Sequence, residues 1–459
     1  MTTELRVSPT DIPGLLVIDL PVHGDSRGWF KENWQRAKMT ALGLPDFAPV
    51  QNNMSFNADA GVTRGIHAEP WDKLVSVATG RVFGAWVDLR DGGSFGAVVT
   101  VELTPGRTVF VPRGVGNAYQ ALEPGTCYSY LVNEHWSAEA KAKYTFANLN
   151  HPGIDWPLPL EGATISDADR THPAIDDVVP FGRPRPVVTG GDGQLGRALR
   201  QILPEAIFVD RAELDITDAD AVAAFDWSEA SAIINAAAWT AVDAAESDGR
   251  AACWAVNVTG TAHLVEAARR HRLPLVHVST DYVFDGTREL HAEDEPFAPL
   301  SAYGAAKAAA DALVATLPRH YILRTSWVIG DGPNFVRTMA RLADQGVSPA
   351  VVDDQFGRLT FADDLARAAV HLLEHAEPGT YNVTSDGEVQ SWFDVADAVF
   401  RARGASGEVS RTDTATFSAG KITAPRPRHS ALDLAKLRAT GFTPVDGAAA
   451  LQRYLEALQ

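Results

Sequence analysis

The stretch PVVTGGDGQLGRALR, at residues 186–200, decides the fold of the second half of this chain. Two valines typical of a short buried strand lead into glycines spaced three residues apart, and a helical pattern follows them. Glycine permits a tight turn, lets the backbone approach a pyrophosphate and lets helix and strand pack closely. The free N–H groups of a helix N-terminus attract phosphate. The stretch therefore predicts a dinucleotide site that includes Gly190, Gly193, Gln194, Leu195 and Gly196.

An acidic residue stands where a dinucleotide-binding unit is expected to hold the ribose. Asp210 follows the next strand-like run, residues 206–209, and lies 20 positions after Gly190. A carboxylate there accepts hydrogen bonds from ribose hydroxyls, whereas a nearby arginine pairs with the 2′-phosphate of NADPH. Arg211 follows Asp210 directly. The two residues pull the cofactor preference in opposite directions, and we favour NADPH, with NADH as the alternative.

The length, net charge and cysteine count of the sequence disfavour several classes of partner and environment. The chain has 459 residues and a formal net charge of −18 at pH 7, which disfavours binding to nucleic acid or to an anionic membrane. No apolar run reaches the ~18 residues of a membrane span, and the polar first residues do not resemble a signal peptide. Two cysteines, Cys127 and Cys253, fit a reduced compartment. We therefore expect a cytoplasmic protein without disulfides.

The texture of the sequence changes near residue 178 and predicts two domains. Residues 1–178 carry short alternating runs punctuated by turn residues, which is typical of an antiparallel sandwich or barrel. The clearest runs are residues 73–78, 82–89, 97–103, 108–111 and 127–132. Residues 179–186 are rich in proline and arginine and predict a semi-rigid linker.

Strand-like runs alternate with alanine-rich helical stretches from residue 187 to residue 459. This alternation predicts an α/β domain built on a doubly wound parallel sheet. Its expected strands are residues 187–188, 207–209, 232–235, 275–279, 322–325 and 350–352.

Four stretches after the glycine turn carry candidate reductase chemistry. Ala236–Ala238 close one strand and leave room for a dinucleotide at the carboxyl edge of the sheet, and Thr280 ends another strand. Tyr303 and Lys307 are four residues apart and so share one helical face, where a lysine ammonium would lower the tyrosine pKa. Such a tyrosine can protonate a carbonyl oxygen while a cofactor delivers hydride. Trp327 closes a further strand, where an indole can stack on a base or sugar.

These residues make the half from Val187 to Gln459 closely similar to dTDP-4-dehydrorhamnose reductase, an extended short-chain dehydrogenase/reductase. The matching segments include GGDGQLG, ELDITD, NAAAWTAVDAAE, VSTDYVFDG, PLSAYGAAK, RTSWV, DDQFGRLT and RPRHSALD. The resemblance implies a Rossmann-type sheet with a small substrate-binding lobe. It also implies a catalytic triad of Thr280, Tyr303 and Lys307.

The same resemblance implies the other site residues of this half. Besides Tyr303 and Lys307, the cofactor would contact Asp215, Ala236, Ala237 and Ala238. The sugar nucleotide would contact Asp281, Tyr282, Trp327, Asn334 and Arg426. The family uses NADPH, and some members accept NADH. Members also bind Mg²⁺ at a dimer contact, but no compact ligand set in this sequence can be assigned to that metal.

Three islands in residues 1–178 combine polar and charged side chains. The first spans residues 25–32, the second spans residues 51–55, and the third places His67 between Arg64 and Lys73. A neutral histidine can act as a base, and the two cations can hold phosphate or stabilise an enolate. Taken alone, these residues fit a structural histidine and solvated charges at least as well as an acid–base site.

The islands resemble dTDP-4-dehydrorhamnose 3,5-epimerase, a cupin-like jelly roll, over about residues 14–177. Further matching segments are GRVFGAWVDLR, FVPRGVGNAYQAL, IDWPLPL and ISDADRTHP. The resemblance implies that His67 removes a proton next to a C4 ketone, that Asp169 is its partner and that Lys73 stabilises the enolate. The nucleotide sugar would contact Arg27, Glu32, Gln51, Asn53 and Arg64. Asp88 matches a structural acid, and the dimeric family implies a homodimer through residues 1–178.

Three departures from the epimerase pattern bear on its activity. Trp136 stands where the family has a tyrosine that protonates the opposite face, and an indole N–H is no proton donor at neutral pH. Asn117 replaces a second histidine, and Glu69 replaces a glutamine. Reprotonation would then use water or one of the side chains His135, Tyr130 and Tyr144; otherwise the domain would epimerise one centre or none.

The two halves resemble enzymes of consecutive steps, which predicts a bifunctional enzyme of dTDP-L-rhamnose biosynthesis. The first half would invert C3 and C5 of dTDP-4-dehydro-6-deoxyglucose, and the second would reduce the C4 ketone with NADPH. Two alternatives stay open. One is a reductase whose first domain only binds nucleotide sugar or dimerises, and the other is the same chemistry on the way to another deoxysugar.

Overall fold

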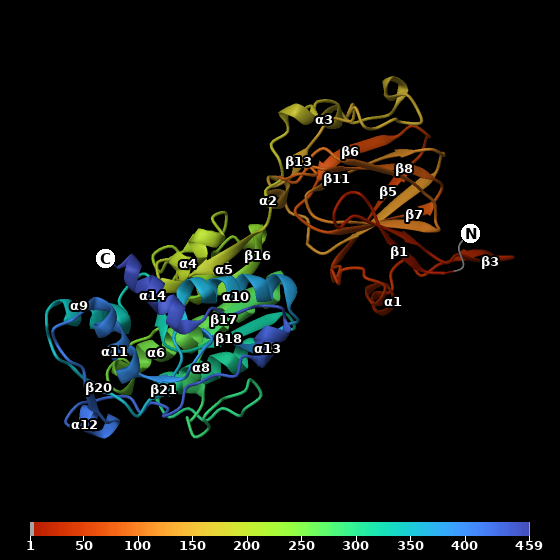
Figure 1. Ribbon diagram of the computed structural model, residues 1–459. Helices are drawn as coiled ribbons and strands as arrows, with labels where there is room; N and C mark the ends of the chain where they lie inside the picture. The colour runs from red at the N-terminus through yellow and green to blue at the C-terminus, as the bar shows by residue number, and fades with distance from the viewer. Residues whose placement is uncertain (1–3, 459) are drawn as a thin grey trace. The chain divides into compact units, whose positions relative to one another are not determined.

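The computed structural model describes residues 4–458 and divides into two compact units (Figure 1). The first unit ends at Arg183 and is coloured red to yellow, and the second begins at Pro184 and continues to blue. Within the described residues, no helix is both long enough and apolar enough to span a membrane.

The first unit consists mainly of two antiparallel sheets. The six-stranded sheet has the order β1-β2-β10-β7-β12-β5, with bounds Arg6–Pro9, Leu16–Asp19, Arg107–Val111, Lys73–Thr79, Thr126–Val132 and Gln51–Asn57. The five-stranded sheet has the order β13-β6-β11-β8-β9, with bounds Thr145–Phe146, Thr63–Ala68, Val115–Ala121, Val82–Asp88 and Val98–Leu103. Val75 of β7, Trp86 of β8 and Tyr119 of β11 share one buried cluster, so the inner faces of the two sheets pack together.

Short elements decorate this sandwich. The hairpin of β3 (His23–Asp25) and β4 (Gly28–Phe30) is exposed. The helices are α1 (Arg36–Ala41), α2 (Ala138–Lys141) and α3 (Asp167–Arg170), with the 3₁₀ turns η1 (Leu160–Gly162) and η2 (Ile175–Asp177). The five strands predicted from alternation begin and end within one residue of β7, β8, β9, β10 and β12. Their burial is less regular than alternation predicts, because β7, β8 and β10 are buried along almost their whole length.

The segment predicted as a linker is partly built into the two units. The Phe181 N–H donates to the Leu89 carbonyl at 2.7 Å, so the start of the segment pairs with the first unit. Its end, from Arg185, already belongs to strand β14 (Arg185–Thr189). The register of β14 shifts between Arg185 and Pro186, and this irregularity accommodates a proline that by itself suggests a strand break.

The second unit is organised around a six-stranded parallel sheet in the order β15-β14-β16-β17-β18-β23. Besides β14, the strands are β15 (Ile207–Val209), β16 (Ala230–Asn235), β17 (Leu275–Thr280), β18 (His320–Thr325) and β23 (Gly379–Asn382). These runs are almost continuously buried, as expected for a sheet covered on both faces.

Helices cover both faces of this sheet. On one face, α4 (Gln194–Ile202) and α10 (Ala362–His375) pack together against the strands. On the other face lie α5 (Ala219–Ala224), α7 (Thr261–His271) and α8 (Ala302–Val314). Helix α6 (Arg250–Trp254) leads through the π-helical turn η5 (Ala255–Gly260) into α7, and the shorter turns are η3 (Trp227–Glu229), η4 (Ala244–Glu246) and η6 (Asp281–Val283).

One strand prediction for this half placed the strand in the wrong sheet. Ala350–Val352 does form a strand, β20, but it pairs with β25 (Ser410–Thr412) and not with the main sheet. The sixth strand of the main sheet is β23, which the sequence reading missed. The β20 strand belongs to a lobe whose core joins α9 (Phe335–Asp344), α11 (Trp392–Arg403) and α14 (Gly447–Ala457).

The small lobe and its surroundings contain the remaining elements. They are β19 (Val328–Ile329) with β22 (Thr360–Phe361), β21 (Phe356–Gly357) with β24 (Gln390–Ser391), α12 (Thr414–Ser418) and α13 (Ala435–Ala439). The lobe therefore stands beside the carboxyl edge of the parallel sheet, because β19 follows β18 almost directly.

Candidate active sites

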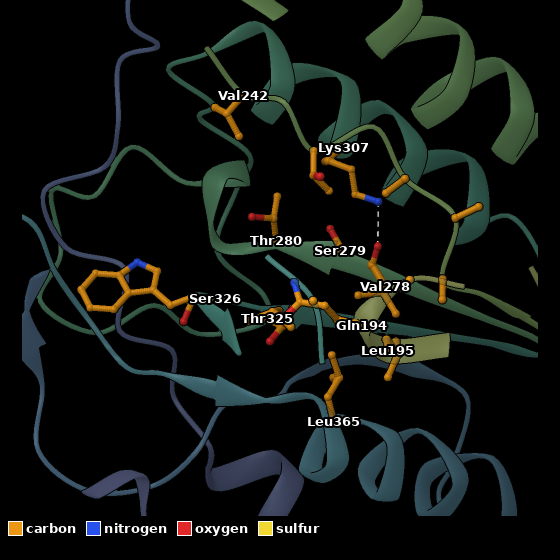
Figure 2. Close-up of a pocket in the computed structure, with 18 of the residues that line it drawn as sticks. Gln194, Leu195, Val242, Val278, Ser279, Thr280, Lys307, Thr325, Ser326 and Leu365 are labelled. Carbon is orange, nitrogen blue, oxygen red and sulfur yellow. Dashed lines mark hydrogen bonds between the residues drawn. The ribbon is translucent and has the colours of Figure 1, made fainter. Parts of the chain in front are cut away.

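A cleft of about 630 Å³ opens at the carboxyl ends of the parallel strands (Figure 2). Its walls come from the glycine turn, the ends of β16, β17 and β18, helix α8 and the small lobe. In doubly wound sheets, ligands bind at this edge. Of the predicted residues, the lining contains Gly193, Gln194, Leu195, Ala236, Ala237, Ala238, Thr280, Asp281, Tyr282, Tyr303, Lys307 and Trp327.

The glycine turn has the geometry of a phosphate cradle. Gly190 has φ +69°, and a Cβ there would lie 2.7 Å from the Ala237 nitrogen. A Cβ on Gly196 would lie 2.4 Å from the Gly190 carbonyl oxygen. Helix α4 begins after Gly193 without a side-chain cap, so the N–H groups of its first turn remain for a ligand. Gly190 and Gly196 therefore shape the cleft without lining it, and the turn fits a dinucleotide pyrophosphate.

The residues predicted to bind the ribose lie outside the cleft lining. The Asp210 carboxylate accepts from the backbone N–H groups of Ala212 and Glu213, at 2.7 Å and 3.1 Å. The exposed Arg211 donates through Nε to Asp215 at 3.1 Å. Asp215 also accepts from the backbone and the hydroxyl of Thr217, so it holds its own loop and Arg211. This loop follows β15 directly, as the sequence predicted.

The predicted triad comes together at the carboxyl end of β17. Thr280 ends β17, and Tyr303 and Lys307 lie one turn apart on α8. Burial, together with the nearby Asp281 carboxyl, raises the pKa of Tyr303 above its ordinary value, and a hydrogen bond with Thr280 opposes the rise. The sequence predicted a lowered pKa for this phenol. The structure corrects that prediction, because the desolvated site disfavours a tyrosinate.

Three aromatic side chains, Trp327, Trp392 and Tyr282, and the carboxyl group of Asp281 also line the cleft. Trp327 stacks on Trp392 of α11 with ring centroids 3.7 Å apart. The ring of Tyr282 meets Tyr303 edge-on at 5.7 Å. Asp281 is buried, which raises its pKa to about 6 despite hydrogen bonds from Ser430 and Thr280. Sequence reasoning missed Trp392, because it reaches the cleft from the small lobe.

Two predicted substrate residues lie behind the cleft lining and not in it. The Asn334 side chain caps α9 by accepting from the Arg337 N–H at 2.9 Å, and its amide donates to the Gly330 carbonyl at 2.9 Å. Arg426 forms an ion pair with Asp243 at 2.8 Å and a hydrogen bond with Tyr282, which does line the cleft. Neither lines the cleft. Asn334 thus fixes the loop at residues 330–333, part of which does line it.

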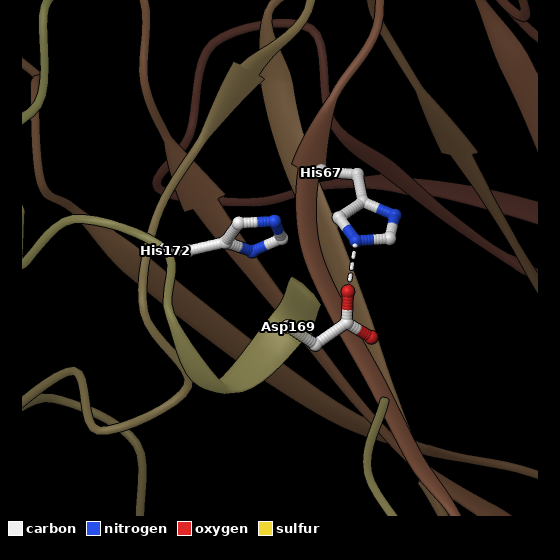
Figure 3. Close-up of side chains that lie close together, drawn as sticks. All are labelled: His67, Asp169 and His172. Atoms are coloured by element: carbon white, nitrogen blue, oxygen red, sulfur yellow. Dashed lines mark hydrogen bonds and ion pairs between the residues drawn. The ribbon is translucent and has the colours of Figure 1, made fainter. Parts of the chain in front are cut away.

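The first unit brings His67 and Asp169 together across 102 residues of sequence (Figure 3). His67 lies on β6, and its Nε2 is 2.8 Å from Asp169 Oδ1. Burial acts to raise the pKa of Asp169, but the hydrogen bond from His67 and the N–H of Gly65 hold it below its ordinary value. Because the charged carboxylate accepts from Nε2–H, Nδ1 of His67 keeps its lone pair and can act as a base.

His172 lies beside this pair and was not singled out in the sequence. Its ring meets His67 edge-on at 5.4 Å and stacks on Phe146 at 4.6 Å. Among the side chains that the structure describes, one group of histidine and acidic residues is compact enough for a metal ion, with ligand atoms of His67, Asp169 and His172 within 4.8 Å. Since His67 and Asp169 already bond to each other, the group is described better as a hydrogen-bonded dyad.

Lys73 is almost fully buried and is not a free cation. Its Nζ lies 2.7 Å from the Glu69 carboxylate and 5.4 Å from the ring centroid of Tyr130. Glu69 also accepts a hydrogen bond from the indole of Trp71. The glutamate that departs from the epimerase pattern therefore forms a buried ion pair with the predicted enolate-stabilising lysine and offsets part of its charge.

The predicted nucleotide-sugar positions of this unit are mostly exposed. Gln51 donates to Asn53 at 2.8 Å and accepts from the backbone N–H of Trp136 at 3.2 Å. Arg64 lies exposed on β6. Arg27 and Glu32 lie on and just after the exposed hairpin, where Arg27 bonds to Asp25 and Glu32 to Lys38. The buried Asp88 holds Arg90 and Ser94.

The side chains proposed to replace the family tyrosine differ in their surroundings. Trp136 is 56% exposed. Tyr144 packs edge-on against Trp71 at 5.5 Å and lies 5.7 Å from Phe146, whose ring also faces His67. Burial raises the pKa of Tyr144 above its ordinary value and that of Tyr130 to about 12, so both phenols keep their protons at neutral pH. Asn117 bonds to the Tyr128 hydroxyl at 2.9 Å.

The parallel sheet, the glycine turn and the Tyr–Lys cleft define a Rossmann-type dinucleotide-dependent oxidoreductase, preceded by a β-sandwich that carries a His–Asp dyad. A family model described as the RmlD substrate binding domain matches residues 185–459. A model described as dTDP-4-dehydrorhamnose 3,5-epimerase matches residues 9–177. The chain therefore belongs to the RmlD family and carries an RmlC-like epimerase domain in front of its RmlD domain.

Individual relatives match one half each. The "Protein RmlC homolog" of Streptococcus pyogenes is 50% identical over 178 residues, which cover 37% of this chain and 89% of the relative. The dTDP-4-dehydrorhamnose reductase of Aggregatibacter actinomycetemcomitans is 40% identical over 287 residues, which cover 58% of this chain and 97% of the relative. The solved structure of dTDP-4-dehydrorhamnose reductase of Bacillus anthracis in complex with NADP is 33% identical, with a TM-score of 0.56. The match covers 60% of this chain and 100% of that chain.

Proposed function

We propose that this chain makes dTDP-L-rhamnose from dTDP-4-dehydro-6-deoxyglucose by epimerisation at C3 and C5 followed by NADPH-dependent reduction at C4. Residues 1–178, which we propose form a jelly-roll domain, carry out the first reaction, and residues 187–459 carry out the second. The observation that carries this proposal is that family models for both reactions match one chain, each over a unit with a matching constellation of side chains.

In the proposed epimerisation, Nδ1 of His67 removes the proton next to the C4 ketone. Asp169 holds the imidazole through Nε2 and stabilises the imidazolium that forms. Lys73, paired with Glu69, lies beside Tyr130 and supplies a buried positive charge toward the enolate. Tyr144 is our candidate for the opposing acid. Its phenol keeps its proton, and its ring packs against Phe146, which also packs against His67.

In the proposed reduction, Tyr303 donates its phenolic proton to the C4 oxygen of the sugar. Thr280 bonds to Tyr303 and orients it, and Trp327 with Tyr282 bounds the space for the sugar. The cofactor supplies hydride when bound. The glycine cradle and the unpaired N–H groups at the start of α4 fit its pyrophosphate, and Arg211 beside Asp210 favours the 2′-phosphate of NADPH.

One assay tests both reactions together. The purified full chain is given NADPH and dTDP-4-dehydro-6-deoxyglucose with no added epimerase, and NADPH absorbance is followed. Oxidation with dTDP-L-rhamnose as the product supports two active units. No oxidation with substrate alone or with a pre-epimerised substrate would refute the reductase proposal.

A second candidate function is favoured by the exposed Trp136. In it, the first unit binds nucleotide sugar without epimerising it. Solvent-deuterium exchange with a Tyr303→Phe chain separates the two, because this variant cannot reduce the ketone. Deuterium at C3 and C5 supports the epimerase, and absence of exchange supports the binding role. NMR of the product of the unmodified chain tests the further alternative of a different deoxysugar.

We also propose a homodimer through the first unit. Strand β5 lies at the edge of its sheet, and Met54 and Phe56 on it are 68% and 67% exposed. Exposed apolar edge strands favour pairing with another chain. Sedimentation of the full chain should give a dimer, and Phe56→Lys should weaken it; a wild-type monomer at micromolar concentration would refute the proposal.

A further inference from the structure

Two tryptophans from distant parts of the chain stack on each other in the lining of the cleft. Trp327 follows strand β18 of the main sheet, and Trp392 is the first residue of α11 in the small lobe. Their ring centroids lie 3.7 Å apart, and their planes meet at 17°. Because both indoles line the cleft, the pair joins the small lobe to the sheet beside the proposed sugar site.

The backbone of Trp327 is strained. Its φ is +46°, in the left-handed region that residues with a Cβ rarely adopt. Such a conformation costs free energy and persists only where the surrounding contacts hold it. The Trp327 carbonyl accepts from the Thr360 N–H at 3.2 Å, and the Ser326 hydroxyl donates to the Arg358 carbonyl at 2.8 Å. Bonds to one neighbouring segment therefore hold the backbone before and after the strained angle.

The indole of Trp327 also lies against the backbone of Gly357 in β21. A Cβ at residue 357 would lie 2.9 Å from Trp327 Cε2 and 3.0 Å from Cζ2. The absence of a side chain at Gly357 leaves the room that the ring occupies. Gly357 and Trp392 thus both limit where the ring of Trp327 can lie.

Trp392 is itself fixed by its helix and by the lobe core. The Ser391 hydroxyl accepts from the Asp394 N–H at 3.1 Å, and the Asp394 carboxylate accepts from the Ser391 N–H at 2.9 Å. This capping box fixes the first turn of α11, where Trp392 lies. The ring of Phe335 packs on Trp392 with centroids 4.5 Å apart. The small lobe therefore provides a firm surface for Trp327.

We propose that Trp392 is a positioning residue that holds Trp327 as one wall of the sugar site. An indole presents a flat apolar surface on which the C–H groups of a sugar ring can pack. Without Trp392, Trp327 loses a contact that offsets its strained backbone, and the wall moves. The inference rests on the proposed reductase function and adds that the small lobe sets the affinity for the sugar.

Fluorine nuclear magnetic resonance of the full chain tests the contact without substrate. The chain is labelled with 5-fluorotryptophan, and the spectrum of Trp327→Phe identifies the Trp327 signal. A stacked indole changes this signal through its ring current, so Trp392→Ala should shift it. The matched control, Trp254→Phe, removes an indole that is 48% exposed and outside the cleft lining, and it should leave the signal unchanged. An unmoved signal in Trp392→Ala would overturn the inference.

Calorimetric titration of the NADP-bound full chain with dTDP-L-rhamnose measures the effect on the sugar. We expect Trp392→Ala to raise the Kd between about three- and tenfold, the range of an aromatic contact. Trp392→Phe keeps an aromatic surface and should stay within about twofold of wild type. The affinity for NADPH should be the same in all three chains. A wild-type Kd for dTDP-L-rhamnose in Trp392→Ala would contradict the proposal.

A double-mutant comparison separates positioning from a direct or merely structural role. If Trp392 acts through Trp327, the chain with both Trp327→Ala and Trp392→Ala should bind dTDP-L-rhamnose as weakly as Trp327→Ala alone. If the two losses add, Trp392 affects the site independently of Trp327. That result would refute the positioning role.

Gly357→Ala moves the same ring and leaves Trp392 in place. The added methyl must displace the indole of Trp327, so this variant should also shift the Trp327 signal and weaken binding of dTDP-L-rhamnose. It keeps the proposal testable should Trp392→Ala fail to fold. A shifted signal with unchanged affinity would show that the position of Trp327 does not set the affinity for the sugar, which would overturn the inference.

These outcomes are distinct from those that test the proposed function. Full reduction in the NADPH assay together with additive losses in the double mutant would refute the positioning role alone. A chain that binds dTDP-L-rhamnose with the expected pattern of affinities but does not reduce the ketone would refute the reductase function and leave the positioning role standing.

Discussion

The backbone of Gly190 passes so close to Ala237 that a Cβ at residue 190 would lie 2.7 Å from the Ala237 nitrogen. Gly190 also has φ +69°, a conformation that disfavours any side chain with a Cβ. The contact locks the glycine turn of β14 onto the end of β16. It therefore fixes the distance between the proposed pyrophosphate site and the small residues that line the cleft.

We predict that Gly190→Ala weakens NADPH binding at least about tenfold, since ~1.4 kcal/mol of lost interaction is enough. The added methyl must displace the backbone at Ala237 and deform the cradle. Fluorescence titration of NADPH measures the change. Gly182→Ala is the matched control, because nothing lies within 4 Å of its new Cβ. Binding as tight as in the wild type would contradict this role of the turn.

Tyr303→Phe should reduce ketone reduction by a factor on the order of 10²–10⁴, because it removes the proposed proton donor and little volume. NADPH affinity should stay near the wild-type value. Stopped-flow measurement of NADPH oxidation with a pre-epimerised substrate tests this. Tyr321→Phe serves as the control, because that hydroxyl bonds to the Ala376 carbonyl away from the cleft. Wild-type turnover in Tyr303→Phe would show that another group supplies the proton.

His67→Ala should stop rhamnose formation from dTDP-4-dehydro-6-deoxyglucose and leave reduction of a pre-epimerised substrate intact. Asp169→Asn should give a similar but smaller loss, because it leaves the base without its charged partner. Both substrates are compared in the same NADPH assay. Equal loss on both substrates would indicate a folding defect and not a missing base.

The stability of the second unit should depend on the ionisation of Asp281. The folded chain holds this proton up to about pH 6, whereas an exposed aspartate releases it near 3.8. The folded state binds more protons between these values, so its stability falls as the pH rises from about 4 to about 6 and then levels off. The full effect is at most about 3 kcal/mol.

Asp281→Asn removes this titration and should become more stable relative to wild type as the pH rises. Urea unfolding of both chains at pH 4.5 and pH 7, followed by tryptophan fluorescence, gives the comparison. If the two chains show parallel pH dependence, Asp281 does not carry the proton that burial predicts.

Local sequence determined much of the second half. The glycine turn, the strand ends and the four-residue spacing of Tyr303 and Lys307 depend on neighbours along the chain, and the structure places them where the pattern indicated. The alternating strands of the first unit were found for the same reason. Hydrophobic periodicity reports which face of an element is buried, but it does not report the partner of that face.

The partners were decided only by tertiary structure. His67 meets Asp169 across 102 residues, and the sequence suggested this pair through resemblance and not through any local pattern. The sequence pattern predicted that β20 belongs to the main sheet, where the structure has β23. A strand pattern does not report the neighbouring strand, because strand order depends on which helices each strand packs against.

The same limit applies to the protons. The direction of the pKa shift of Tyr303 could not be predicted from its spacing to Lys307, because it depends on how far the surrounding segments desolvate the phenol. Sequence therefore determined which chemical groups this protein has and on which elements they lie. Packing decided which of them are desolvated and hydrogen-bonded to each other, because both effects depend on contacts between distant segments.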